Sequence, residues 1–173
     1  PGYNEEQSQG IMVIRSVMAA FASGIDEYIY YMMRNATNND DAPGTFATSG
    51  FIGGPQSNRI YQSWYYVSTV MQHLKNYQPD AVIKESGDVW IYRFRHLQYK
   101  DSVAYYMICP TTSGNKISNY KLYCKTAGGK TIKQVNLKDN NTAGTVTTIK
   151  SGNGFFETTV SENPVFVFFK ENK

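Results

Sequence analysis

The run that organises the first part of the chain is Gly24-Ile25-Asp26-Glu27-Tyr28-Ile29-Tyr30-Tyr31-Met32-Met33-Arg34. It is almost continuously apolar and aromatic, and a polar loop, residues 35–41, follows it. A strand covered on both faces has this pattern, whereas a strand with one solvated face alternates apolar and polar residues. We therefore predict a buried strand here. Left bare, such a run invites aggregation, so we expect helices, a second copy or a missing partner to cover it.

Apolar residues at helical spacing flank this run on both sides. Asn4 is a good N-cap for a helix that ends near Ser23, and Gly24 is the glycine expected just past its C-terminus. A second helix is predicted from Ser57 to about Tyr77, and Pro79 follows it. Helix, buried strand, long loop and helix form one unit of an α/β barrel or doubly wound sheet, which cannot close a sheet alone.

After Pro79 short strand-forming runs alternate with turn residues such as glycine, asparagine and serine. The predicted strands lie near Ala81–Lys84, Val89–Arg95, Ser102–Cys109, Asn119–Lys125, Thr131–Leu137, Thr145–Lys150, Phe155–Ser161 and Val165–Lys170. Eight short strands with hairpin-length turns are typical of an antiparallel sandwich. The predicted fold class is α+β: an antiparallel β-sandwich domain over residues 80–173, preceded by a helix-strand-helix segment over residues 1–79.

Composition and charge argue against several classes of partner. Residues 1–80 carry four basic and seven acidic groups, and residues 81–173 carry thirteen and seven. The lysines are spaced singly among polar residues, which favours a solvated β surface over a nucleic-acid site. No apolar run has the length of a membrane span. Cys109 and Cys124 flank a predicted hairpin and could face each other, but free cysteines fit the spacing equally well.

The sequence contains no recognisable catalytic motif. It has no glycine-rich phosphate loop, no CxxC pair and no HExxH motif, and neither His73 nor His96 is near a nucleophile elbow. Asp40 and Asp41 are adjacent in the long polar loop, where such a pair is more often simply exposed than bound to metal. We therefore predict no catalytic residue, no metal and no cofactor from the residues alone.

Several motifs resemble the end of a clan A glycoside hydrolase barrel. They are Gly2-Tyr3-Asn4, Arg15-Ser16-Val17-Met18, Ala20-Phe21-Ala22-Ser23-Gly24-Ile25-Asp26, Tyr30-Tyr31-Met32-Met33-Arg34 and Thr48-Ser49-Gly50-Phe51. In that clan the seventh strand ends in the nucleophilic glutamate, a helix bearing an arginine follows, and a short link leads into an aromatic eighth strand. The second half resembles the C-terminal sandwich of these enzymes, with Ser161–Val167 as its last strand. The resemblance is Bacteroidetes-like and spans essentially the whole chain.

The resemblance implies that both catalytic glutamates lie outside the chain, the nucleophile just before Pro1 and the acid/base far upstream. Retaining hydrolysis needs two carboxyl groups about 5 Å apart, so the chain alone is expected to be inactive. Tyr3 and Asn4 would lie beside the nucleophile, and Tyr31 and Arg34 at the mouth of the eighth strand, all as substrate-binding residues. The alternative is that these are strand and loop residues without a pocket.

The predicted sandwich has its own candidates for sugar binding. Trp90, Tyr92 and Phe94 alternate onto one face of a strand and could stack on sugar rings. Tyrosines near them in the pattern are Tyr105, Tyr106, Tyr120 and Tyr123. An inward-facing aromatic stripe is more often part of a core, and only exposure separates these two interpretations.

The leading hypothesis is a C-terminal fragment of a bacterial polysaccharide-degrading enzyme that is secreted, periplasmic or at the cell surface. The alternative is a stand-alone carbohydrate-binding module, and a third is a sandwich that only braces the barrel. The expected ligand is a polysaccharide or oligosaccharide rather than nucleic acid. The expected protein partner, through Ile25–Met33, is a missing barrel portion or a second copy.

Overall fold

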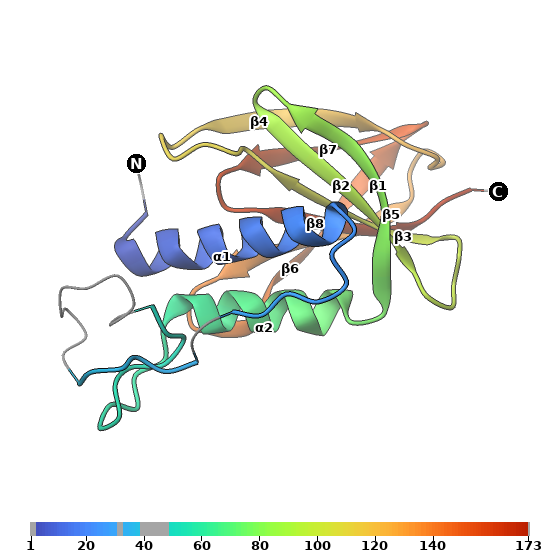
Figure 1. Cartoon of the computed structure of the whole chain (residues 1–173). Coiled ribbons are helices and arrows are strands. Elements are labelled where there is room, and N and C mark those ends of the chain that lie inside the picture. Colours follow the sequence, from blue (N-terminus) through green and yellow to red (C-terminus); the bar gives the residue numbers. More distant parts are fainter. Residues whose placement is uncertain (1–2, 31–32, 39–48, 173) are drawn as a thin grey trace.

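The computed structural model describes residues 3–30, 33–38 and 49–172, and within them it has two helices and eight strands (Figure 1). The helices are α1 (Glu5–Ala22) and α2 (Gln62–Leu74). The strands are β1 (Tyr77–Ser86), β2 (Val89–His96), β3 (Ser102–Ile108), β4 (Lys116–Tyr123), β5 (Thr131–Lys138), β6 (Asn141–Gly152), β7 (Phe155–Ser161) and β8 (Val165–Lys170). The α+β class and all eight predicted strands are confirmed.

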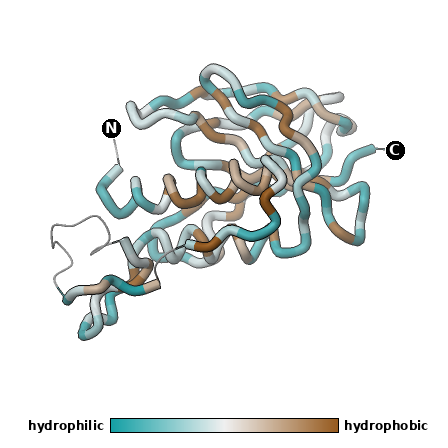
Figure 2. Tube along the Cα trace, viewed as in Figure 1, coloured by the Kyte–Doolittle hydropathy of each residue, from teal (hydrophilic) through white to brown (hydrophobic). Residues whose placement is uncertain are grey.

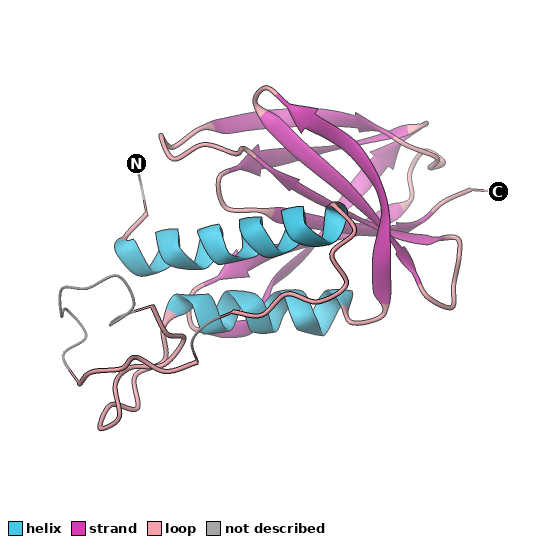
Figure 3. Ribbon diagram, viewed as in Figure 1, coloured by secondary structure: helices cyan, strands magenta, loops and turns pink. Residues whose placement is uncertain are grey.

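The strands form a curled antiparallel sheet in the order β1-β2-β3-β8-β5-β6-β7-β4. The long strand β6 makes the curl possible, because residues 145–150 pair with β5 and only Ser151 and Gly152 pair with β7. We call β1-β2-β3-β8-β5-β6 the main layer and β7-β4 the outer layer. The two helices lie together on one side of the strands (Figure 3).

Two separate cores follow from this layering. The helix-side core joins α1 and α2 to the main layer, through residues such as Ile14, Val70 and Phe166. The sheet-side core joins the main layer to the outer layer, through residues such as Val103, Ile132 and Phe156. Because alternate side chains of a strand point to opposite faces, the central strands of the main layer supply both cores.

Local sequence accounts for where α1 begins and ends. The Asn4 side chain accepts a hydrogen bond from the Gln7 backbone N–H at 2.9 Å, and the Gln7 side chain accepts one from Asn4 N–H at 3.0 Å. Glu5 and Glu6 occupy the first turn, where they complement the helix dipole. Past the C-terminus Gly24 has φ +84°, which favours glycine. The predicted cap and helix end are confirmed.

The predicted buried strand over residues 24–34 is not formed, which corrects the sequence interpretation. Residues 24–30 are irregular, and Arg34 makes only an isolated parallel bridge with Ile52. Ile29 is 81% exposed and Met33 55% exposed. A buried strand needs neighbours on both edges, and the sheet-facing sides of both helices are already occupied by the main layer. Figure 2 shows apolar residues along this segment as well as along the helices.

The second helix is shorter than predicted, and the predicted domain boundary falls inside a strand. α2 starts at Gln62 because Ile60 instead bridges to Ile52 in antiparallel fashion. Pro79 lies within β1, where the pairing with β2 shifts register between Pro79 and Ala81. The division at residues 79 and 80 stays a prediction.

Truncation of Phe166 tests the helix-side core. Phe166 is 2% exposed on β8, so Phe166→Ala is expected to lower the free energy of unfolding by about 3–5 kcal/mol. Urea denaturation measures this, with Val146→Ala as the control, since Val146 is 50% exposed and should change stability by about 0.5 kcal/mol or less. Equal effects of the two substitutions would contradict the assignment of Phe166 to a core.

Candidate functional site

The N-terminal candidates Tyr3 and Asn4 have structural partners in this fold. The Asn4 side chain forms the capping box of α1. Tyr3 is half-buried and packs against the helix-side core. Their role toward a sugar stays a prediction, and Tyr31, the next candidate, lies outside the described residues, as do Asp40 and Asp41.

Arg34 is the centre of a polar cluster that ties residues 33–35 to the loop before α2. Its Nη1 donates to the carbonyl oxygens of Gly54 and Ser57, both at 2.7 Å. The neighbouring Asn35 is 2% exposed; it accepts from Gly50 N–H at 2.8 Å and donates to Tyr61 Oη at 2.9 Å. Arg34 thus holds backbone carbonyls in this structure, and its predicted contact with substrate stays a prediction.

The aromatic stripe of β2 is mostly core. Tyr92 is 0% exposed and Phe94 3% exposed. The Tyr92 ring stacks on Tyr106 with centroids 5.6 Å apart, and its hydroxyl donates to Glu85. Tyr92 therefore offers no ring face to a ligand, whereas Trp90 is half-buried against the same core. Sugar binding by Trp90 and Tyr92 stays a prediction, but the low exposed fractions of Tyr92 and Phe94 favour the core interpretation.

Glu162 is a buried carboxylate that organises the loop after β3. It is 3% exposed, and its Oε1 accepts from the Thr111 hydroxyl at 2.5 Å, Ser113 N–H at 2.7 Å and Gly114 N–H at 2.9 Å. Burial by itself raises the pKa of this carboxyl, but the hydrogen bonds outweigh it and hold the pKa below its usual range. The sequence motif around residues 161–167 contains this residue, yet spacing alone did not identify its partners.

Asp139 connects both helices to the hairpin between β5 and β6. Its two carboxylate oxygens accept from the Tyr66 hydroxyl on α2 and from the Gln7 amide on α1, both at 2.5 Å. Burial and the hydrogen bond to Asp139 raise the pKa of Tyr66, which is 2% exposed. Like Glu162, this carboxylate is engaged by its own chain.

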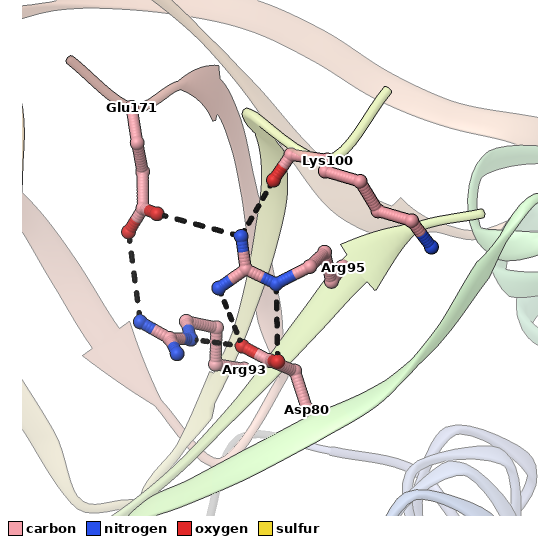
Figure 4. A network of polar contacts seen from close by, with 5 residues as sticks. All are labelled: Asp80, Arg93, Arg95, Lys100 and Glu171. Carbon is pink, nitrogen blue, oxygen red and sulfur yellow. Dashed lines mark hydrogen bonds and ion pairs between the residues drawn. The ribbon is translucent and has the colours of Figure 1, made fainter. Parts of the chain in front are cut away.

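A third set of charges lies near the start of β1 (Figure 4). Asp80 accepts from Arg93 at 2.5 Å and twice from Arg95 at 3.1 Å, and both guanidinium groups also face Glu171 at 3.6–3.7 Å. Partial burial alone would raise the pKa of Asp80. The hydrogen bonds and charges of Arg95 and Arg93 outweigh this effect, so the pKa lies below its usual value. The carboxylates and cations here neutralise one another, which favours a structural role in holding β1, β2 and the C-terminal segment.

A cavity of about 540 Å³ lies between the two helices and residues 24–30. Its lining is mainly apolar and includes Val17, Phe21, Val67 and Tyr77. The described residues contain no cluster of three or more metal-ligating side chains, there or elsewhere. In the same described residues, no helix is long and apolar enough to cross a membrane.

The outer layer carries an aromatic pair in which Tyr123 is exposed and Phe155 is half-buried; sequence reasoning placed Tyr123 among the tyrosines near the β2 stripe but did not select Phe155. Tyr123 on β4 is 75% exposed and pairs in register with Phe155 on β7, with ring centroids 6.2 Å apart. Two residues along the same strands, Lys121 and Glu157 form an ion pair at 3.3 Å. We call these four residues the outer-face platform. Its sequence signal is that the aromatic residue Tyr123 shares a strand face with the charged Lys121, while Leu122 between them is buried.

Both cysteines are free. Cys109 is 0% exposed in the sheet-side core, and Cys124 is half-buried against it. Burial raises the pKa of both thiols, to about 11 for Cys124. Neither thiol is therefore activated as a nucleophile.

Comparison with known proteins supports the fold. No protein-family model matches the chain, and no curated protein matches its sequence. Among solved structures, a family 39 glycoside hydrolase from the gut symbiont Bacteroides cellulosilyticus WH2 superposes with TM-score 0.66 at 16% identity, over 96% of this chain. A GH30 endoxylanase from Clostridium papyrosolvens C71 matches 72% of this chain and 31% of its own, with TM-score 0.49 and 12% identity, too weakly to define a shared fold.

The chain spans 31% of the length of the family 39 enzyme that it matches. The predicted resemblance to a glycoside hydrolase is confirmed at the level of fold, since the match includes nearly all described helices and strands. At 16% identity the likeness concerns the path of the backbone. The arrangement that this chain shares with part of that enzyme is two helices packed on a curled antiparallel sandwich.

Replacement of Glu162 by glutamine tests its role in stability. Because folding lowers the pKa of Glu162, its contribution is fully present above the unfolded pKa of about 4.3 and is lost as pH falls through the folded pKa. Glu162→Gln is therefore expected to cost about 1.5–3 kcal/mol at neutral pH. The difference between the two proteins should shrink on acidification.

Urea denaturation at about pH 7 and about pH 3 measures this difference. Glu157→Gln is the matched control, because the Glu157 side chain is 46% exposed and its substitution should change stability by less than about 1 kcal/mol. A Glu162→Gln cost that is the same at both pH values would show that the charge of Glu162 does not stabilise the loop.

Proposed function

We propose that this chain is part of a polysaccharide-degrading glycoside hydrolase, supplying the last helices of its barrel and an accessory β-sandwich. The single observation that carries this is the superposition of 96% of the chain on 31% of a family 39 glycoside hydrolase. A match that takes in both helices and the sandwich favours a common origin for the whole unit rather than for the sandwich alone.

In this proposal the chain is inactive alone. Retaining hydrolysis needs two carboxyl groups about 5 Å apart across the sugar. The carboxylates with defined surroundings are instead engaged: Glu162 by a backbone loop, Asp139 by Tyr66, and Asp80 by two arginines. These partners support structural roles, so the reacting carboxylates are assigned to the part of the enzyme that this chain does not span.

The exposed segment after α1 supports the same proposal. Ile25 is 48% exposed and Ile29 81% exposed, in a run whose composition suits a strand covered on both faces. We assign its missing cover to the rest of the barrel, with Tyr3, Asn4, Tyr31 and Arg34 near the substrate there. Such an enzyme would act outside the bacterial cytoplasm, at the cell surface, in the periplasm or after secretion.

The alternative, a stand-alone carbohydrate-binding module, is favoured by a different observation. The outer-face platform puts an aromatic ring in solvent on the sandwich, away from the helices. A binding sandwich and a barrel tail are compatible, because accessory domains and catalytic domains use different surfaces.

An activity assay tests the main proposal. The chain alone is expected to release no reducing sugar from xylan, mannan or β-glucan, while the longer protein that contains it should hydrolyse at least one of them. The longer protein with its sandwich deleted separates an accessory role from a catalytic one. Turnover by these 173 residues alone would contradict the proposal.

Self-association tests the role of the exposed segment. Ile29→Asp puts a charge at an 81% exposed apolar position and is expected to reduce concentration-dependent association of the isolated chain. Sedimentation velocity measures this, with Val146→Asp on β6, a 50% exposed position, as the matched control. Equal changes in association for both substitutions would show that the segment around Ile29 does not mediate self-association.

A further inference from the structure

The platform is unusual among the aromatics of this chain. Only Tyr99 and Tyr123 are exposed among the aromatic residues that the structure describes, at 58% and 75%. The other tyrosines of the predicted sugar-binding set, such as Tyr105 and Tyr106, are buried in the two cores. A large ring left in water on an otherwise polar face is the kind of feature that marks a binding surface.

The second ring of the platform is held in place by the backbone beneath it. Gly152 pairs with Phe155 in register across the ladder between β6 and β7. A Cβ atom at Gly152 would lie 2.1–2.6 Å from three atoms of the Phe155 ring, so the ring rests directly on the glycine. The absence of a side chain at this position therefore lets Phe155 lie against the sheet beside Tyr123.

Charged groups of both signs complete the platform. Lys121 Nζ lies 3.3 Å from Glu157 and 4.3 Å from the centroid of the Phe155 ring. The ion pair therefore lies directly beside the two rings, with the ammonium group over Phe155 and the ring of Tyr123 left open to solvent. An aromatic face thus lies next to one strong donor and one strong acceptor.

This combination suits a neutral sugar. A pyranose ring has an apolar C–H face that stacks on an aromatic ring, and hydroxyl groups at its rim that both donate and accept hydrogen bonds. Glu157 can accept from one hydroxyl while Lys121 donates to another. Because the two charges cancel, the pair does not favour a polyanionic chain over a neutral one.

Pairing of β4 with a strand of another protein is less favourable. β4 is an edge strand of the sheet, and an open edge can add a strand. Its ladder with β7 shifts register between Ile117 and Tyr120, and Asn119 has φ +55°. A bulge and a left-handed residue disrupt the regular edge that strand addition requires.

We propose that Tyr123 stacks on a pyranose ring of a neutral polysaccharide, with Lys121 and Glu157 binding its hydroxyl groups and Phe155 packing beside the Tyr123 ring. The site rests on the proposed function only for the choice of polysaccharides. Tyr123 contacts the sugar in this proposal, and Gly152 is a positioning residue that acts through Phe155.

Affinity electrophoresis of the complete chain in gels with xylan, mannan or β-glucan tests the proposal. The wild-type chain should be retarded by at least one of them, and Tyr123→Ala should weaken that retardation about tenfold or more. Tyr99→Ala is the matched control, because it removes the other exposed tyrosine and should leave retardation unchanged. Gly152→Ala should weaken it also, by displacing Phe155.

Thermal unfolding of each variant separates loss of binding from loss of fold, and Tyr123→Ala should unfold within a few degrees of wild type because its side chain is exposed. No retardation of the wild-type chain on any of the three polysaccharides would overturn the proposal. So would equal retardation of Tyr123→Ala and wild type, or a loss caused by Tyr99→Ala instead. Binding is measured without turnover, so an inactive longer protein would contradict the proposed function and leave this test intact.

Discussion

Every side chain of β3 is buried, on one face or the other, and this strand therefore needs cover on both sides of the main layer. Ala104, Tyr106 and Ile108 belong to the helix-side core, while Val103 and Met107 belong to the sheet-side core. β8 divides its residues between the cores in the same way. Because a sheet buried on both faces needs a layer against each face, the helices and the outer layer are both required by these central strands.

Polar contacts determine where the helices lie on that face. Asp139 binds Gln7 of α1 and Tyr66 of α2, so one turn of the sheet holds both helices. At the same end of these strands, Arg15 of α1 donates to the carbonyl oxygen of Thr111 at 2.8 Å, in the loop that Glu162 organises. Apolar packing is not directional, so we infer that these hydrogen bonds fix the position and orientation of α1 and α2 on the main layer.

Local signals predicted the strands and α1 well, and they failed where a distant neighbour decides the outcome. Each strand is bounded by turn residues, and Gly87 and Gly154 have the positive φ that such turns require. The run at residues 24–34 has the composition of a buried strand, but composition cannot supply the strands that would pair with it. Tyr123 was named only as one of four tyrosines for a related reason: alternation predicts which residues share a face, but not which face is covered.

The chain has 14 tyrosines, and the position of each one in the layers explains its role better than their number. Tyr92 and Tyr66 are buried with their hydroxyls on Glu85 and Asp139, so they contribute apolar area to the core while their polar ends are satisfied. Most rings on the central strands of the main layer, such as Tyr105 and Tyr106, lie under the helices or the outer layer. The outer layer has a covered inner face and a bare outer one. A tyrosine that alternates outward there, as Tyr123 does, is one whose ring a sugar can reach.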